Sequence, residues 1–81
     1  MKLDYTERFI QSLEDAPPQV QKAFYKQSAL LLQNLRHPSL RAKKYDEARD
    51  IWQARVTRGW RFCFKIARDT YYLIDIIAHP K

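Results

Sequence analysis

Cysteine and glycine are almost absent from this chain of 81 residues, which contains one of each, Cys63 and Gly59. A single cysteine excludes an internal disulfide framework, so we expect a reducing setting such as the cytoplasm. The scarcity of glycine excludes a glycine-rich phosphate loop and the G-x-S-x-G motif of serine hydrolases. We expect the one glycine, Gly59, to adopt a positive φ in a turn between two strands.

Long apolar runs are also missing. The segment MKLDYTERF carries acidic side chains where a signal peptide would need an apolar core, and no segment reaches the length of a membrane span. We therefore expect a cytoplasmic protein without a membrane partner. The two histidines and the cysteine lack the spacing of a metal site, so we expect neither a metal nor a cofactor.

Positive charge is concentrated in the second part of the chain. Hydrophobic residues make up 46% and aromatic residues 14%, which indicates a single small globular domain over 1–81. The net charge is +6, and residues 35–81 account for all of it, with eleven Lys and Arg against five Asp and Glu. Such segregation is typical of proteins that bind nucleic acid or an acidic protein segment, although solubilising charge alone produces a similar excess.

Apolar spacing predicts two helices in the first part of the chain. After a short strand at 2–4, Thr6 can cap a helix with apolar residues on one side. Pro17 and Pro18 end that helix and start a second one, which runs to about Leu35. The apolar stripes predict that the two helices pack as an antiparallel hairpin.

Alternating side chains predict three strands in the rest of the chain. They span roughly 51–56, 60–66 and 71–78, and the stretch 40–50 is expected to be a polar connection. Two helices followed by an antiparallel meander predict an α+β fold. In that fold the helices cover one face of an antiparallel sheet of three to four strands.

The alternation also places most cations of these strands on the face away from the helices, here called the outer face. Arg61 and Lys65 alternate with aromatic residues in the middle strand, and Arg55 has the same orientation in the first. In the last strand, the expected core residues are Tyr72, Ile74 and Ile76, and the expected outer-face residues are Tyr71, Leu73, Asp75, Ile77 and His79.

An outer face with Arg55, Arg61, Lys65 and His79 suits the cleavage of RNA without a metal. Arginine binds phosphate through a planar fork of donors, and histidine titrates near neutral pH. Metal-free cleavage needs a base for the ribose 2′-hydroxyl, a cation for the charge on phosphorus and an acid for the 5′-oxygen. The same residues also fit an outer face that is simply solvated.

Four segments form an ordered set: HPSLRAKK (37–44), IWQARV (51–56), WRFCFKI (60–66) and YYLIDIIAHPK (71–81). Together they resemble the RelE/ParE superfamily of toxins from bacterial toxin–antitoxin pairs, and more closely its RelE-like branch. The resemblance covers essentially the whole chain and implies a strongly twisted sheet. It also implies a toxin that cleaves mRNA in the ribosomal A site through attack by the 2′-hydroxyl. Its expected partners are the ribosome, mRNA and a protein antitoxin, with operator DNA bound only through the antitoxin complex.

The resemblance implies roles for individual residues. Arg61 matches an arginine that stabilises the phosphate or the transition state, and His79 matches a histidine that acts as general acid or base. Lys44 lies in a basic segment that supplies the base in some relatives, a role that requires a strongly lowered pKa. The expected RNA- and phosphate-binding residues are Arg41, Lys43, Arg55 and Lys65.

Two departures from the family leave alternatives open. The stretch before Lys43 lacks the glutamate of some relatives, and no tyrosine follows His79, so Tyr71 is the nearest tyrosine expected on the outer face. A ParE-like poison of DNA gyrase would share the fold, and so would an inactive relative that only binds an antitoxin. Leu73 and Ile77, expected beside the cations, would give an antitoxin segment apolar anchors.

Overall fold

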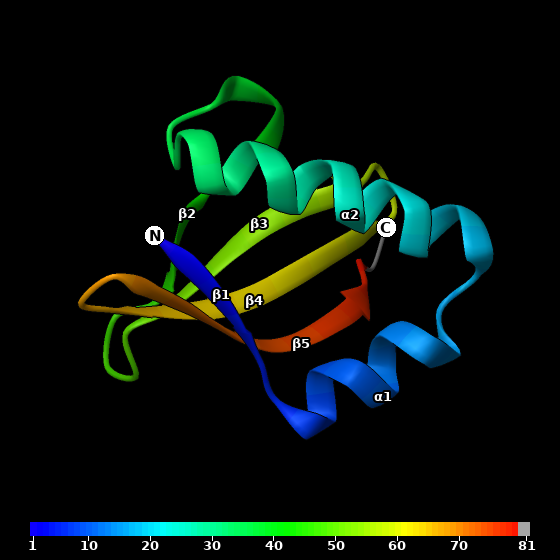
Figure 1. The fold of residues 1–81 in the computed structure, drawn as a ribbon, viewed down its shortest axis with the longest axis horizontal. Coiled ribbons are helices and arrows are strands. Elements are labelled where there is room, and N and C mark those ends of the chain that lie inside the picture. Colours follow the sequence, from blue (N-terminus) through cyan, green and yellow to red (C-terminus); the bar gives the residue numbers. More distant parts are fainter. Residues whose placement is uncertain (80–81) are drawn as a thin grey trace.

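The computed structural model describes residues 1–79 and shows two helices on a five-stranded sheet (Figure 1). The strand order is β1-β5-β4-β3-β2, so the last four strands form a meander. The α+β fold class predicted from the sequence is confirmed, with more strands than expected. The elements are β1 (Lys2–Tyr5), α1 (Glu7–Asp15), α2 (Pro18–Gln33), the 3-10 helix η1 (Pro38–Leu40), β2 (Lys43–Asp46), β3 (Ile51–Thr57), β4 (Trp60–Ala67) and β5 (Thr70–Ala78).

Two short edge strands correct the predicted sheet. β1 pairs with β5 in parallel, with Lys2 opposite Thr70, so the sheet is mixed rather than purely antiparallel. β2 lies in the stretch expected to be a polar connection and pairs with β3. An edge strand needs little apolar content because its backbone supplies the hydrogen bonds and one side stays open. The polar sequence KKYD therefore carried no strand signal.

Each helix packs mainly on the sheet. Thr6 caps α1 as predicted, and its hydroxyl accepts from the Phe9 N–H (3.2 Å) and donates to the Leu73 carbonyl (2.8 Å). In Figure 1, α1 lies along β5 while α2 crosses above β3. The predicted hairpin is therefore splayed, because both apolar stripes face the sheet, and the rings of Phe9 and Phe24 (5.0 Å) bridge the two helices. No helix within residues 1–79 is long and apolar enough to cross a membrane.

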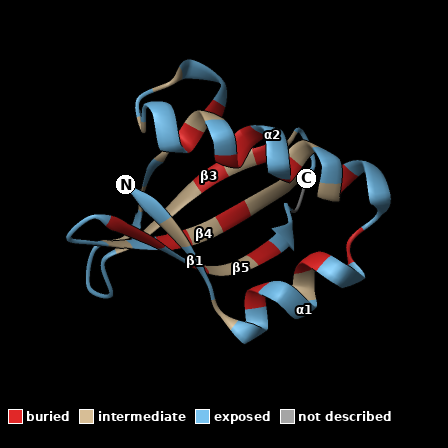
Figure 2. Cartoon of the chain, in the orientation of Figure 1, coloured by how far each residue is buried: buried red, intermediate tan, exposed pale blue. Residues whose placement is uncertain are grey.

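The core is a set of aromatic rings between the helices and the middle of the sheet. Phe9, Phe24, Phe62 and Phe64 are completely buried, and the Phe24 ring meets the Phe62 ring edge-on at 5.3 Å. Figure 2 shows the buried residues on the sides of the helices that face the strands. Each fully buried Phe contributes about 1.5–3 kcal/mol of hydrophobic stabilisation, a large share for so small a chain.

A β-bulge reverses the side-chain alternation of β5. Cys63 pairs with Asp75 but Phe64 pairs with Leu73, which leaves Ile74 as an extra residue. One inserted residue moves the preceding side chains to the opposite face. Tyr71 (4% exposed) and Leu73 (0%) therefore lie in the core, and the outer-face position predicted for both is wrong. Tyr72, predicted in the core, is 39% exposed, whereas Ile76 and Ile77 lie where the sequence predicted.

The left-handed backbone positions are not where the sequence placed them. Gly59 has no positive φ, so that prediction is wrong, and a β-carbon on Gly59 would meet no atom within 4 Å. A register shift between Arg55 and Thr57 accommodates the turn instead. The residues with positive φ are Arg41 (47°), Asp50 (58°) and Arg68 (56°).

Candidate functional site

Two arginines face each other across β3 and β4. Arg55 pairs with Arg61 on the outer face, and the neighbouring pair, Ala54 and Phe62, faces the core. Burial lowers the pKa of Arg61, and the charges of Arg55 and Arg41 lower it further. The predicted outer-face position of both arginines is observed, and they lie close enough to repel each other.

The Arg61 side chain is held by the turn before its own strand. Its Nη1 donates to the carbonyl oxygens of Thr57 (2.7 Å), Arg58 (3.2 Å) and Trp60 (2.9 Å). Arginine has five N–H donors, and no hydrogen bond within residues 1–79 uses Nε or Nη2 of Arg61. The guanidinium group is therefore fixed along one edge and retains donors for an anion.

His79 reaches the same turn from β5. Its backbone N–H donates to the carbonyl of Gly59 (2.7 Å), which extends the pairing of β5 with β4 beyond Ala78. The His79 side chain is exposed. The turn 57–60 therefore contacts both the side chain of Arg61 and the backbone of His79 at one end of the sheet. That the His79 side chain shares the outer face with Arg61 stays a prediction.

A general base at Lys44 would need a lowered pKa, but the groups around Lys44 favour its charged form. Its Nζ lies 2.6 Å from Oδ1 of Asp50 and 5.5 Å from the centre of the Trp52 ring. The hydrogen bond to Asp50, with the charges of Asp50 and Glu47, raises the pKa of Lys44. Lys44 also pairs with Trp52, whose side chain faces the core, and not with the outer-face arginines. Both its position and its raised pKa disfavour Lys44 as the general base.

The other predicted site residues divide between the two faces. Lys43 and Lys65 are exposed on the outer face of β2 and β4. Arg41 is exposed at the end of η1, near enough to Arg61 to affect its pKa. Tyr71 lies in the core against Phe64, and burial raises its pKa, so it cannot serve an outer-face site.

Most of these cations form no ion pair with a carboxylate of the described part of the chain. Within residues 1–79 the ion pairs join Arg8 to Asp75, Lys44 to Asp50 and Arg49 to Asp46. An uncompensated cluster of arginines attracts anions, and planar guanidinium groups match phosphate. The cations of this part of the chain that take part in none of these pairs include Arg41, Lys43, Arg55, Arg58, Arg61 and Lys65.

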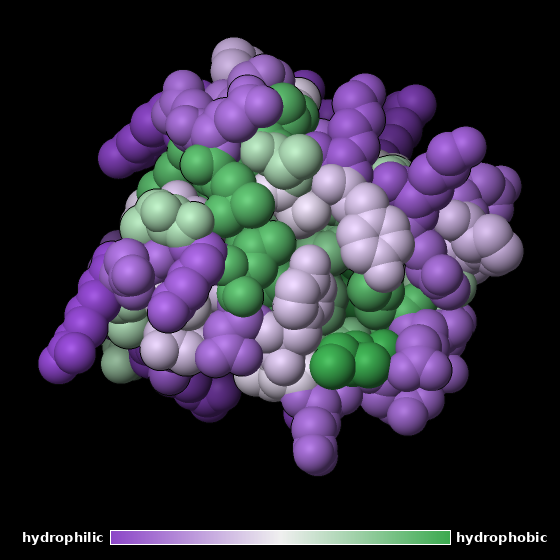
Figure 3. Space-filling view, in the orientation of Figure 1, coloured by the Kyte–Doolittle hydropathy of each residue, from purple (hydrophilic) through white to green (hydrophobic). Residues whose placement is uncertain are grey.

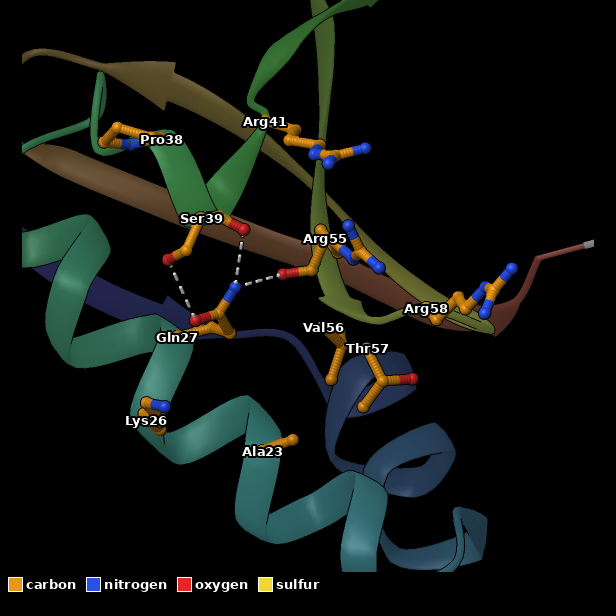
Figure 4. A pocket seen from close by; sticks show the side chains of 10 residues that line it. All are labelled: Ala23, Lys26, Gln27, Pro38, Ser39, Arg41, Arg55, Val56, Thr57 and Arg58. Atoms are coloured by element: carbon orange, nitrogen blue, oxygen red, sulfur yellow. Dashed lines mark hydrogen bonds between the residues drawn. The ribbon is translucent and has the colours of Figure 1, made fainter.

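Three residues that the sequence did not single out also belong to this region. Lys26 and Arg58 line a groove of about 460 Å³ together with Arg41 and Arg55, and the side chain of Gln27 lies between its walls (Figure 4). Gln27 and its neighbour Ser28 are buried polar residues among the apolar residues of α2 that face the core. A glutamine at a core position of a helix is a sequence signal, because buried polar groups need specific partners.

Neither a family model nor a curated protein sequence matches the chain. Several solved structures do. The YoeB/ParE toxin from Agrobacterium tumefaciens has a TM-score of 0.79 at 14% identity, covering 99% of this chain and 100% of that one. The isolated E. coli RelE toxin has a TM-score of 0.76 at 17% identity, covering 98% and 84%. The RelB-RelE antitoxin-toxin complex from Methanococcus jannaschii has a TM-score of 0.73 at 16% identity, covering 91% of this chain and 87% of that one.

These likenesses establish the fold. The chain has two helices on a mixed sheet, and its fold is that of the YoeB/ParE and RelE toxin structures. The resemblance inferred from the four sequence segments is therefore confirmed at the level of the fold.

Proposed function

We propose that this protein is the toxin of a type II toxin–antitoxin pair and cleaves mRNA in the ribosomal A site without a metal, in the cytoplasm. The observation that supports this most strongly is the turn 57–60, whose carbonyl oxygens accept hydrogen bonds from the Arg61 side chain and from the backbone N–H of His79. A phosphate placed there meets the unused donors of Arg61, with Arg55 beside it.

The proposed reaction is a transfer within the RNA chain. The 2′-oxygen attacks phosphorus and forms a new bond while the bond from phosphorus to the 5′-oxygen breaks, leaving a 2′,3′-cyclic phosphate and a 5′-hydroxyl. Negative charge develops on the phosphoryl oxygens, where Arg61 and Arg55 stabilise it. One proton leaves the 2′-hydroxyl and one reaches the 5′-oxygen, and we assign proton transfer to His79 with solvent as the second partner.

The fixed position of Arg61 favours catalysis over simple charge attraction. Three carbonyl oxygens orient its Nη1 before any ligand arrives. Donors that are oriented in advance stabilise a transition state without the cost of ordering a flexible side chain. A side chain present only for solubility would gain nothing from such an arrangement.

We also propose a protein antitoxin as partner. The expected anchor Leu73 is buried, whereas Ile77 and Tyr72 are exposed on the outer face. Further exposed apolar groups lie on the helix side, where Ile10 and Tyr25 border a groove of about 430 Å³ between α1 and α2. Figure 3 shows apolar surface across the middle of this side, with hydrophilic side chains around it. A segment with apolar and acidic residues would fit that pattern.

Primer extension on mRNA in a ribosome-programmed translation reaction tests the proposed cleavage. Wild type is compared with Arg61→Ala, His79→Ala and, as control, Arg68→Ala, with circular dichroism to verify the fold of each. We expect cuts at A-site codons with wild type and the control, and a loss of about 10²-fold or more with His79→Ala.

Intact message with folded wild-type protein, over a broad range of codons, would contradict the proposal. Inhibition of gyrase supercoiling would then support a ParE-like poison. If expression of the protein also leaves growth unaffected, the second alternative, an inactive relative that only binds an antitoxin, would be supported.

A further inference from the structure

A groove between α2, η1 and β3 has the chemistry of a phosphate-binding site. Among residues 1–79, its lining includes four cations and no carboxylate. Apolar side chains complete the lining, so one part suits an anion and another part suits a sugar or a base. The cations are Lys26, Arg41, Arg55 and Arg58, and the apolar side chains are Ala23, Pro38 and Val56.

Gln27 fixes the walls of the groove relative to each other. Its side chain is buried, and its Nε2 donates to the carbonyl oxygens of Ser39 (3.1 Å) and Arg55 (2.9 Å). The hydroxyl of Ser39 lies 3.5 Å from Oε1 of the same amide. One side chain on α2 therefore ties together the 3-10 helix before Arg41 and the strand that carries Arg55, as Figure 4 shows.

The arginines come from three separate elements and gather on one side of this groove. In Figure 4 the guanidinium groups of Arg41, Arg55 and Arg58 point away from α2, on the same side of the view. Arg41 has φ 47° and ψ 41°, a left-handed conformation that costs a non-glycine residue about 1–2 kcal/mol. The chain therefore accepts both backbone strain and like-charge repulsion at this place. A bound anion would offset the repulsion.

We propose that this groove binds the phosphate of a nucleotide next to the segment held at Arg61, in a single-stranded RNA. The inference rests on the proposed function, because the neighbouring RNA segment is the one that Arg61 is proposed to hold. Arg55 connects the two places, since it lines the groove and lies opposite Arg61. An acidic protein segment would meet the same cations. RNA is favoured because the groove continues directly into the outer face, and because apolar and cationic surfaces together match a nucleotide.

Fluorescence anisotropy with a labelled 2′-O-methyl oligoribonucleotide tests the groove without ribosomes or cleavage. The groove variant is Lys26→Ala with Arg58→Ala, and neither residue belongs to the proposed cleavage site. The control is Lys22→Ala with Arg68→Ala, which removes a cation one turn earlier on α2 and another in the β4–β5 turn. Both variants therefore lose the same charge from similar elements.

We expect the groove variant to bind about tenfold more weakly at low salt. The slope of log K against log salt should be smaller by about 0.7 for each phosphate that the variant no longer neutralises. The control should bind like wild type. Equal weakening of both variants would indicate general charge attraction and overturn the inference, and so would an undetectable affinity of wild type.

Poly-glutamate is the second probe in the same assay. If the groove variant binds poly-glutamate more weakly but binds the oligonucleotide like wild type, the groove belongs to an acidic protein segment and the inference is overturned. Since no cleavage is measured, failure of the proposed nuclease activity would be seen separately.

Discussion

Arg55 and Arg61 stand directly opposite each other on adjacent strands of the outer face. Like charges in cross-strand positions destabilise a sheet. Here the repulsion is visible in the lowered pKa of Arg61, to which Arg55 contributes after burial. We therefore expect the repulsion between Arg55 and Arg61 to lower the free energy of unfolding, and an anionic ligand bound beside them to offset it.

Replacing Arg55 with Gln should stabilise the free protein. The change removes the like charge and leaves the backbone carbonyl that accepts from Gln27, so we expect a gain of about 0.2–1 kcal/mol in the free energy of unfolding. Urea denaturation at low salt measures it. Arg49→Gln is the matched control, because Arg49 pairs with Asp46 and its loss relieves no repulsion. A destabilised Arg55→Gln would show that the two arginines do not oppose folding.

Arg61→Lys should separate charge from geometry. Lysine keeps the positive charge but cannot make three hydrogen bonds to the turn while also presenting free planar donors. We expect a loss of about 1 kcal/mol in stability and of at least tenfold in cleavage. Denaturation and primer extension on the same preparation measure both. Full activity with lysine would mean that a point charge suffices at this position.

Gln27→Leu should destabilise the protein although leucine is apolar and similar in size. The substitution leaves the carbonyl oxygens of Ser39 and Arg55 without their donor, at a cost of about 1–3 kcal/mol for each that stays buried. Gln19→Leu on an exposed position of α2 is the control and should change stability by less than about 0.5 kcal/mol. Urea unfolding of both compares them. Equal effects would mean that Gln27 does not join the walls of the groove.

Two substitutions test the unusual backbone positions. Arg68→Gly should stabilise the protein or leave it unchanged, because glycine relieves the left-handed conformation at φ 56°.

Gly59→Ala should be tolerated, and we expect a gain of about 0.4–1 kcal/mol in the free energy of unfolding. The φ of Gly59 is not positive, and among residues 1–79 its added β-carbon would meet no atom outside its chain neighbours. Thermal unfolding measures both. A strong loss for Gly59→Ala would place the glycine in a conformation that alanine cannot adopt.

Lys44→Ala should leave cleavage within a few-fold of wild type. The pKa of Lys44 is raised, so its pairing with Asp50 favours the folded state below the ordinary lysine pKa of 10.5. That contribution is lost as the pH rises through the raised value. Primer extension measures the cleavage, and unfolding between pH 7 and pH 11 measures the stability. Lys44→Ala would become more similar to wild type at the alkaline end. A loss of cleavage as large as that of His79→Ala would restore Lys44 as a catalytic candidate.

The sequence predicted the helices and the main strands better than the irregularities and the pairing of the strands. Thr6 as a cap, the break at Pro17 and the alternation around Arg61 follow local rules, and the structure has all three. The bulge in β5 could not be predicted, because Ile74 fits either face of a sheet and an extra residue leaves no local mark. The pairing of β1 with β5 could not be predicted either, because the sequence of a strand does not specify which distant strand it pairs with.

The same limit applied to the candidate site. The alternation of β4 predicted that Arg61 lies on the outer face, but the pairing of Lys44 with Asp50 depends on a turn that closes between β2 and β3. Likewise, the role of Gln27 emerges only when η1 and β3 meet beside α2. Identity and orientation of a side chain follow from local sequence, whereas its partners follow from the fold.

The parallel pairing of β1 with β5 also fixes the order in which the protein can be completed during synthesis. The hydroxyl of Thr6 reaches a carbonyl 67 residues further along the chain, and β1 has no other strand neighbour in the sheet. Because β1 is synthesised before β5, it must wait, unpaired, until β5 has emerged from the ribosome. The helices and the meander can assemble from local contacts, whereas β1 can join the sheet only after β5 has formed.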